Sequence, residues 1–457
     1  MVHGSMASPH RAARIGLLVL APTTALVACT FVNGFDDVKP LTAKDTGTIT
    51  DSVVTETDID TGTVVTDSGV DTPVDTGPVD RGLVVVSGQI AGDAGPGQPV
   101  LAVLDPADGK RLGTDEKITV VAAKYDGAHD RWYLWINKSG TSFDPVSTTE
   151  IELQIRTFDR TKNAWATLST LKVPTIVDEA TSTVLKDRLA YVSYTTATTF
   201  ELTVIDTTTA TAPKVISPGL ALAVPPIGVI GTPAPTGGGT VNMLSVTSSA
   251  GCVSGVCKVA FQRATVPAAP NPATSSGTKQ VADTLDIAAG QPAWGSFYNG
   301  GSPQDLLMVP PTGAATKATL IRLSPISNDP VTGTTPVAFT VAKNTLRSLT
   351  VSECLKTAFV TDLNGTQVYG VPLAFDGTPN VFGLGRSGQR LYFEPYTHTV
   401  LAPYRASAAA FEIAALEVTG TDKAPIFKKR VGTSWTPPAE LQPTLLAVKA
   451  PDDFPCP

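Results

Sequence analysis

The chain has 457 residues, enough for a large folded core, and its 34 basic and 41 acidic residues give a formal net charge of −7. The acidic excess lies in residues 29–81, while residues 82–457 are close to electrically neutral. Because a nucleic-acid-binding protein needs a field of positive charge, this composition argues against nucleic acid as a partner.

Residues 1–28 have the pattern of a targeting segment. Arg11 and Arg14 form a basic start, and residues 15–27 form an apolar run too short to span a bilayer as a permanent helix. The run leads into Leu-Val-Ala-Cys at residues 26–29. This tetrapeptide resembles the lipobox of bacterial lipoproteins. The resemblance implies a signal peptide over residues 1–28, a diacylglyceryl group on the Cys29 thiol and cleavage before Cys29; the alternative is an ordinary secretory signal.

The same resemblance predicts where the mature chain would be held. Each buried acyl methylene contributes about 0.8 kcal/mol, so two or three chains on Cys29 would make a durable membrane anchor. Thr30 is not the Asp that retains many such lipoproteins in the inner membrane, which favours the outer membrane, facing the periplasm or the surface. The Asp- and Thr-rich stretch 29–81 is predicted to be a disordered tether with a span of ~40 Å.

Four short acidic motifs lie in this tether. Asp-Thr-Gly occurs at Asp45, Asp60 and Asp75, and Asp-Ser-Gly occurs at Asp67. Aspartic proteases carry such a motif, but their paired carboxylates share a proton within β-rich lobes. Copies this close together in polar sequence favour a low-complexity repeat instead. Calcium would suit clustered carboxylates, but no ligand loop of known spacing is present.

Residues 82–457 alternate short apolar runs with Gly, Pro, Asp and Asn, which predicts an all-β domain. A pair of such runs recurs seven times. The pairs are 100–105 with 117–123, 130–136 with 150–159, 186–194 with 200–206, 241–246 with 257–262, 305–309 with 318–323, 356–362 with 367–375, and 390–396 with 410–418. Repeats of this size in an all-β chain are typical of propeller blades.

The domain therefore resembles a β-propeller, most simply with seven blades of four strands each. Six or eight blades are alternatives, as is a string of β-sandwich modules. The Pro- and Gly-rich stretches 225–239 and 267–277 are interpreted as long loops on one face, and residues 435–457 as a Pro-rich tail.

Four cysteines remain in the mature chain once Cys29 is lipidated: Cys252, Cys257, Cys354 and Cys456. An even number in an oxidising compartment predicts two disulfides. The Ser-Gly pair between the first two suits a hairpin turn that would place them opposite each other, within disulfide reach. By elimination the last two would pair, closing a loop of about a hundred residues worth ~4.7 kcal/mol in the chain-entropy model.

The search for catalytic chemistry finds little. His129 and His398 each lie near an expected turn or strand end, with no second His or Cys at ligand spacing, so we assign no catalytic residue, metal or cofactor. Asp126 precedes a Gly and is interpreted as a hairpin turn residue. Trp132 and Trp135 have opposite parity in one strand, so one is expected in the core and the other partly exposed.

We therefore expect a non-enzymatic lipoprotein that presents a rigid propeller to an envelope protein or a polysaccharide. A purely structural role in a surface layer is compatible with the same features. The alternative is an envelope hydrolase or lyase whose acidic residues gather from separate blades at the mouth of the channel. Carboxylates with raised pKa values at that mouth would favour the enzyme, and apolar and hydroxyl residues would favour binding.

Overall fold

The computed structural model divides the chain into two units, residues 1–75 and 76–457. The residues it describes run from 82 to 449. The gaps within these limits are 91–97, 139–150, 247–255, 281–286, 289–292, 310–316, 324–336, 342–345, 363–366, 375–378, 384–389, 406–410, 430–440 and scattered single residues or pairs. The expected signal peptide, tether and lipidation site at Cys29 lie outside the described residues.

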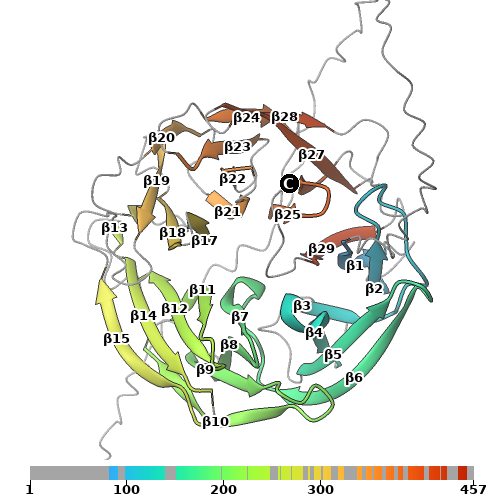
Figure 1. The fold of residues 1–457 in the computed structure, drawn as a ribbon, viewed down its shortest axis with the longest axis vertical. Helices are drawn as coiled ribbons and strands as arrows, with labels where there is room; N and C mark the ends of the chain where they lie inside the picture. The colour runs from blue at the N-terminus through green and yellow to red at the C-terminus, as the bar shows by residue number, and fades with distance from the viewer. Residues whose placement is uncertain are drawn as a thin grey trace, which may run out of the picture. The chain divides into compact units, whose positions relative to one another are not determined.

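Seven antiparallel sheets of the second unit form a ring, and each sheet is one blade (Figure 1). From the ring axis outward, blade 1 contains β29 (Leu441–Val448), β1 (Val84–Ile90) and β2 (Gln98–Leu104). Blade 2 contains β3 (Thr119–Asp126), β4 (Arg131–Asn137), β5 (Ile151–Asp159) and β6 (Ala164–Val173). Blade 3 contains β7 (Ser182–Leu185), β8 (Arg188–Thr196), β9 (Thr199–Asp206) and β10 (Lys214–Leu222).

The remaining blades repeat this order. Blade 4 contains β11 (Pro226–Pro233), β12 (Gly239–Val246), β14 (Val259–Val266) and β15 (Thr274–Gln280). Blade 5 contains β17 (Ala293–Asn299), β18 (Ser302–Val309), β19 (Lys317–Leu323) and β20 (Val337–Thr340). Blade 6 contains β21 (Leu346–Ser352), β22 (Thr357–Asp362), β23 (Gln367–Pro372) and β24 (Asn380–Gly383). Blade 7 contains β25 (Tyr392–Glu394), β26 (Thr399–Arg405), β27 (Phe411–Thr421) and β28 (Ala424–Lys429).

Few other elements accompany the blades. A small sheet joins β13 (Val256–Cys257) to β16 (Ile287–Ala288), and two 3-10 turns, η1 (Gly127–His129) and η3 (Glu179–Thr181), precede β4 and β7. The described part of the chain has no α-helix, and its 3-10 turns are too short to cross a membrane. The expected all-β propeller is confirmed.

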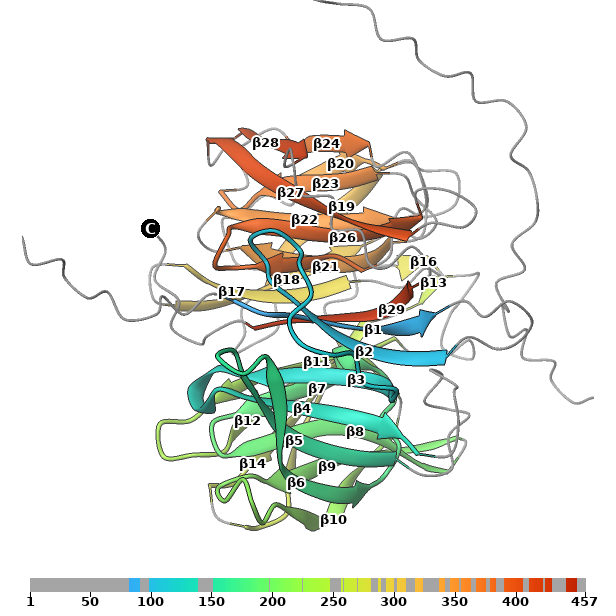
Figure 2. The same cartoon turned by 90° about the vertical axis from the view of Figure 1, so that its right-hand side faces the viewer.

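The innermost strands close the ring. Each of β29, β3, β7, β11, β17, β21 and β25 contacts the next, and β25 contacts β29 again. In Figure 2 the ring is turned edge-on, and the C-terminal strand β29 lies beside the N-terminal strand β1. Their antiparallel register runs from Val84 opposite Val448 to Ile90 opposite Leu441. The stretch expected to be a Pro-rich tail therefore supplies the inner strand of blade 1.

The core lies between neighbouring blades. Every residue of β4 is buried, whereas most of the outer strand β6 is exposed or half-buried. The two tryptophans of β4 do point to opposite faces: Trp132 packs in the cluster shared with blade 1, and Trp135 packs in the cluster shared with blade 3. The expectation that one would be partly exposed is wrong, because a blade is covered on both faces; the two are 1% and 0% exposed.

Five of the seven expected strand pairs are adjacent strands of one blade, beginning with β4 and β5. The first pair is wrong, because β2 and β3 belong to different blades. The last pair, β25 and β27, shares a blade but is separated by β26. The prediction of a loop over 225–239 is also wrong in part, since strand β11 occupies most of this stretch. Prolines are tolerated there because β11 is the inner edge strand of its sheet, and a proline on the free edge removes no hydrogen bond between strands.

Candidate functional site

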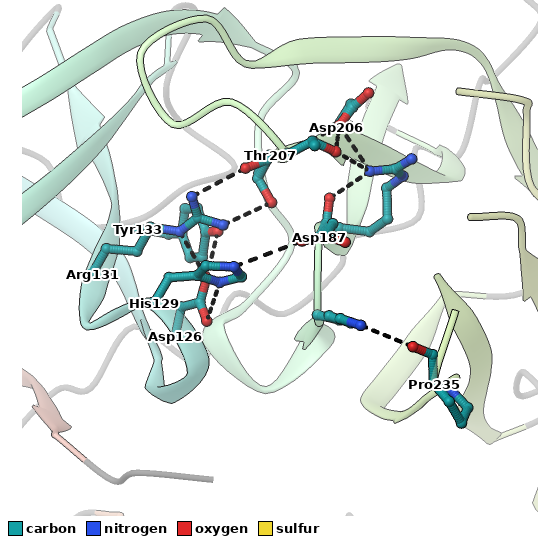
Figure 3. Close-up of polar contacts among 11 residues, drawn as sticks. Asp126, His129, Arg131, Tyr133, Asp187, Asp206, Thr207 and Pro235 are labelled. Carbon is teal, nitrogen blue, oxygen red and sulfur yellow. Dashed lines mark hydrogen bonds and ion pairs between the residues drawn. The ribbon is translucent and has the colours of Figure 1, made fainter. Parts of the chain in front are cut away.

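A dense set of polar contacts joins the turns of blades 2, 3 and 4 (Figure 3). At its centre is Asp126, whose side chain is fully buried at the end of β3. Its carboxylate accepts hydrogen bonds from Arg131 Nε at 2.7 Å and Tyr133 Oη at 3.0 Å. The Nδ1 atom of His129 lies 3.1 Å from the same oxygen, Oδ2. The residue interpreted as a simple turn former is therefore the hub of a buried network.

The network links blade 2 to blade 3. Arg131 donates to the carbonyl oxygen of Thr207 at 3.0 Å and to its hydroxyl at 3.1 Å. On the other side of the His129 ring, Nε2 lies 3.6 Å from Asp187 Oδ1. Burial raises the pKa of Tyr133, so its hydroxyl stays a donor to Asp126.

A second set of contacts extends the network to blade 4. The Arg188 guanidinium, 3% exposed, donates through Nη1 to the Asp187 carbonyl, Asp206 Oδ1 and Thr208 Oγ1, and through Nη2 to the Ala268 carbonyl. Lys186 Nζ donates to the Pro235 carbonyl at 2.8 Å. We call the full set the loop network; its members are Asp126, His129, Arg131, Tyr133, Lys186, Asp187, Arg188, Asp206, Thr207 and Thr208. Each of its carboxylates contacts an arginine or the His129 ring, and these contacts tie neighbouring blades together.

A different polar group lies at the ring axis. Asp178 caps η3, accepting from the backbone N–H of Ala180, just before inner strand β7 of blade 3. Arg390 lies just before inner strand β25 of blade 7 and donates to Asp178 Oδ1 at 2.6 Å. Blades 3 and 7 are separated by blades 1 and 2 (Figure 1). The contact between Asp178 and Arg390 therefore joins two blades that are not neighbours in the ring.

Glu179 stands next to this cross-ring pair, but it has a poorer set of partners. Its side chain is 18% exposed, and Arg390 Nη1 approaches Oε2 only to 3.8 Å. Oε2 is itself buried and has no hydrogen-bond partner among the residues that the structure describes. Burial raises the pKa of Glu179 to about 7, although the nearby Arg390 and Lys124 lower it in part. An ionised Glu179 is therefore incompletely solvated by the protein.

Lys124 completes the group. It lies on inner strand β3 of blade 2, half-buried, and β3 contacts η3. Burial lowers the pKa of its ammonium group, and the carboxylate of Glu179 offsets this in part. We call Lys124, Asp178, Glu179 and Arg390 the axis cluster. It holds an acid and a base whose pKa values both move towards neutrality, which is the usual mark of a binding or proton-transfer site.

The residues singled out from sequence fall elsewhere. His129 belongs to the loop network, and His398 occupies the turn between β25 and β26 with a positive φ of 52°. Cys257 lies in β13, whose backbone pairs with β16, while Cys252, Cys354 and Cys456 lie outside the described residues. Within the described ranges, no three His, Cys, Asp or Glu side chains are grouped to hold a metal ion.

The axis cluster had no sequence signal. Asp178 and Arg390 are 212 positions apart, and neither belongs to a motif. Only Asp178 had a detectable local role, because Asp followed three residues later by Thr181 forms a capping box. That pattern predicts a helical turn and says nothing about the partner across the ring.

Comparison with known proteins finds no matching family model and no matching curated protein. Solved structures do match. A Bacteroides fragilis protein assigned as a candidate 6-phosphogluconolactonase is 14% identical with a TM-score of 0.50, over 82% of this chain and 99% of that chain. A Bacteroides uniformis protein of the same description is 11% identical with a TM-score of 0.47, over 81% and 99%.

A third structure, apo AztD from Citrobacter koseri, is 8% identical with a TM-score of 0.46, over 80% of this chain and 98% of that chain. At such identities a likeness concerns the fold alone. It carries no activity to this chain.

Proposed function

We propose that this chain is a lipid-anchored cell-envelope protein whose propeller binds a partner without catalysis. The observation that carries the proposal is the pairing of carboxylates in the loop network. Asp126, Asp187 and Asp206 are each in contact with a cationic or imidazole side chain. A hydrolase of the glycosidase type needs two facing carboxyl groups with different protonation states, and paired carboxylates cannot supply them. Turns held in place by these contacts form a rigid surface, which suits the binding of a partner.

The anchoring half of the proposal rests on the sequence around Cys29. An alkyne fatty acid fed to cells should label the wild-type protein, which should sediment with membranes. The Cys29→Ser variant should be unlabelled. If that variant stayed in the membrane fraction and was still cleaved before residue 29, the lipoprotein assignment would be wrong.

The location and partner follow from the anchor. We place the propeller at the outer membrane, held off by the tether, where an envelope protein or a polysaccharide is within reach. Protease added to intact cells should cleave within residues 45–80 if the propeller faces outward, and only after permeabilisation if it faces the periplasm. Crosslinking should then capture one partner reproducibly with the anchored protein; a propeller that captures none on either side contradicts a binding role.

Two disulfides belong to the same proposal, Cys252 with Cys257 and Cys354 with Cys456. The second would add a covalent tie to a ring that the pairing of β29 with β1 already closes. Non-reducing peptide mapping of protein from the envelope should recover both linkages. A peptide joining Cys252 to Cys354 would refute both.

The alternative, an envelope hydrolase or lyase, is favoured by one observation, the pKa of about 7 at Glu179. A carboxyl group with that pKa suits general acid or base catalysis near neutral pH. The first substrate to try is a sugar lactone, given the fold shared with the Bacteroides fragilis protein. Turnover by the wild type that is lost in Glu179→Gln would establish this alternative over the binding role.

A further inference from the structure

The axis cluster contains two opposite charges with unmet hydrogen-bonding capacity. Glu179 Oε2 is buried and accepts no hydrogen bond from the part of the chain that the structure describes. Lys124 interacts with Glu179 through its charge, yet the described residues give its ammonium group no hydrogen bond or ion pair. Buried polar atoms are normally satisfied, so a group in this state points to something that meets both residues.

The other two members set the boundary of the site. Asp178 and Arg390 satisfy each other at 2.6 Å and leave Lys124 and Glu179 as the available pair. The side chains of Asp178 and Arg390 are 42% and 31% exposed, so solvent reaches the cluster from their side. With two cations and two carboxylates, the cluster carries no net charge when all four are ionised.

These features define the occupant. It must donate a hydrogen bond to Glu179 and accept one from Lys124, and it should bring no net charge into a site that is already balanced. A hydroxyl group both donates and accepts, and hydrogen bonds to charged groups are the stronger ones. Ions are disfavoured, because an extra buried charge would be desolvated without an opposite charge to match it.

We propose that Lys124 and Glu179 form a site at the ring axis for a neutral, hydroxyl-rich ligand, a sugar or a polyol. The proposal deepens the binding role above and rests on it. Lys124 donates to a ligand hydroxyl oxygen, and a hydroxyl of the same ligand donates to Glu179 Oε2. Arg390, from across the ring, donates to Asp178, the residue that caps η3, and this keeps the Glu179 carboxylate in place.

Three sugars that differ chiefly in charge test this directly. D-glucose is neutral, 6-amino-6-deoxy-D-glucose is largely cationic at pH 8 and D-glucuronate is anionic. Saturation-transfer NMR with the full mature chain at pH 8 should show saturable binding of glucose and at least about tenfold weaker binding of the two charged sugars. Absence of any saturable sugar signal would mean that water alone meets the two groups, and the proposal would be overturned.

Two isosteric variants place the site. Glu179→Gln and Lys124→Met should each weaken glucose binding by about tenfold or more, the scale of one lost charge-assisted hydrogen bond. The matched controls are Asp108→Asn and Lys110→Met, which remove the same charges from a surface pair 2.9 Å apart. They should leave binding unchanged. Thermal unfolding of each variant checks that it is folded.

Other outcomes overturn the proposal in distinguishable ways. Glucose binding that survives both axis variants would place the sugar elsewhere. Tighter binding of glycine than of glucose would mean that the site accepts a zwitterion. If no sugar binds while crosslinking still captures an envelope protein, the ligand class is wrong and the binding role stands; if both fail, the proposed function fails with it.

Discussion

The loop network and the axis cluster are made of the same kinds of side chain and differ in how they are paired. Asp126 contacts three side chains of its own blade, Arg131, Tyr133 and His129. Arg390 Nη1 lies 3.8 Å from Glu179 Oε2, and within the described ranges this oxygen accepts no hydrogen bond. Residue type alone therefore does not separate a structural carboxylate from an available one, whereas the count of donors around it does.

The difference also follows from where the partners come from. The loop network joins neighbouring blades, whose turns lie side by side and can supply many donors. The axis cluster joins blades 2 and 3 to blade 7, which is not their neighbour in the ring and reaches Asp178 through Arg390. Among the described residues, Glu179 Oε2 accepts no hydrogen bond and Lys124 makes none, so these charges are partly unmatched, which suits recognition.

Removing the hub of the loop network should have the largest effect. Asp126→Ala leaves Arg131 buried without its carboxylate, and breaking a buried ion pair costs about 3–5 kcal/mol. Urea unfolding should show this as a lower midpoint with an unchanged slope. The exposed Asp108→Ala is the control and should leave the midpoint almost unchanged. Equal midpoints for the two variants would mean that the network does not lock the blades.

At the axis cluster, removing a carboxylate is expected to raise the free energy of unfolding instead of lowering it. The pKa of Glu179 is about 7 in the folded protein against 4.5 for an ordinary Glu, so the protonated carboxyl favours folding. This contribution is fully present below about pH 4.5 and is lost as pH rises through about 7. Glu179→Gln should therefore be more stable than wild type at pH 8 by up to about 3 kcal/mol and similar to it at pH 4.5.

Urea unfolding at the two pH values checks this prediction. Asp108→Asn serves as a control, because the pKa of the Asp108 carboxyl group is lowered through a hydrogen bond from Lys110, whereas that of Glu179 is raised. A Glu179→Gln protein that is less stable than wild type at pH 8 would show that the carboxylate is well paired, and the contrast between the two regions would disappear.

A smaller loss is expected from His129→Gln. Asp126 keeps Arg131 and Tyr133 as donors, so the change removes one hydrogen bond of a half-exposed ring and costs about 1 kcal/mol. Combining it with Asp126→Ala in a double-mutant cycle measures the coupling between the two. Strict additivity would mean that His129 does not belong to the network.

The smallest effect is a change in titration. Lys124→Met removes a positive charge that lowers the pKa of Glu179, so that pKa should rise, by less than about one pH unit. Carbon-detected NMR of the Glu179 carboxyl group gives the value directly. Lys138→Met is a suitable comparison, since Lys138 pairs with Glu152 in blade 2. An unchanged Glu179 titration in Lys124→Met would place the ammonium group too far away to share a ligand.

Much of the fold could be predicted from the sequence, because a middle strand and its neighbour recur as two apolar runs. The pair made by β4 and β5 shows this well: both strands lie inside a blade, and the hairpin between them is local. The first pair failed because β2 is followed by a new blade, while blade 1 takes its inner strand from the other end of the chain. No spacing rule shows a contact between Val84 and Val448.

The candidate site could not be predicted for a similar reason. Lys124, Glu179 and Arg390 come from three blades, and only closure of the ring brings them near one another. Asp126 was recognised as a turn residue, yet its buried carboxylate accepts a hydrogen bond from Arg131, which also donates to Thr207 of the next blade. Sequence patterns report local geometry, and pairing across blades is not local.

The titration of Glu179, with and without D-glucose, tests the central claim most directly. A pKa of about 7 in the free protein, falling when glucose saturates, is expected because a ligand hydroxyl that donates to the carboxylate stabilises its charged form. A pKa near 4.5 that glucose does not change would contradict the account, since it would mean that the carboxylate is already satisfied within the protein.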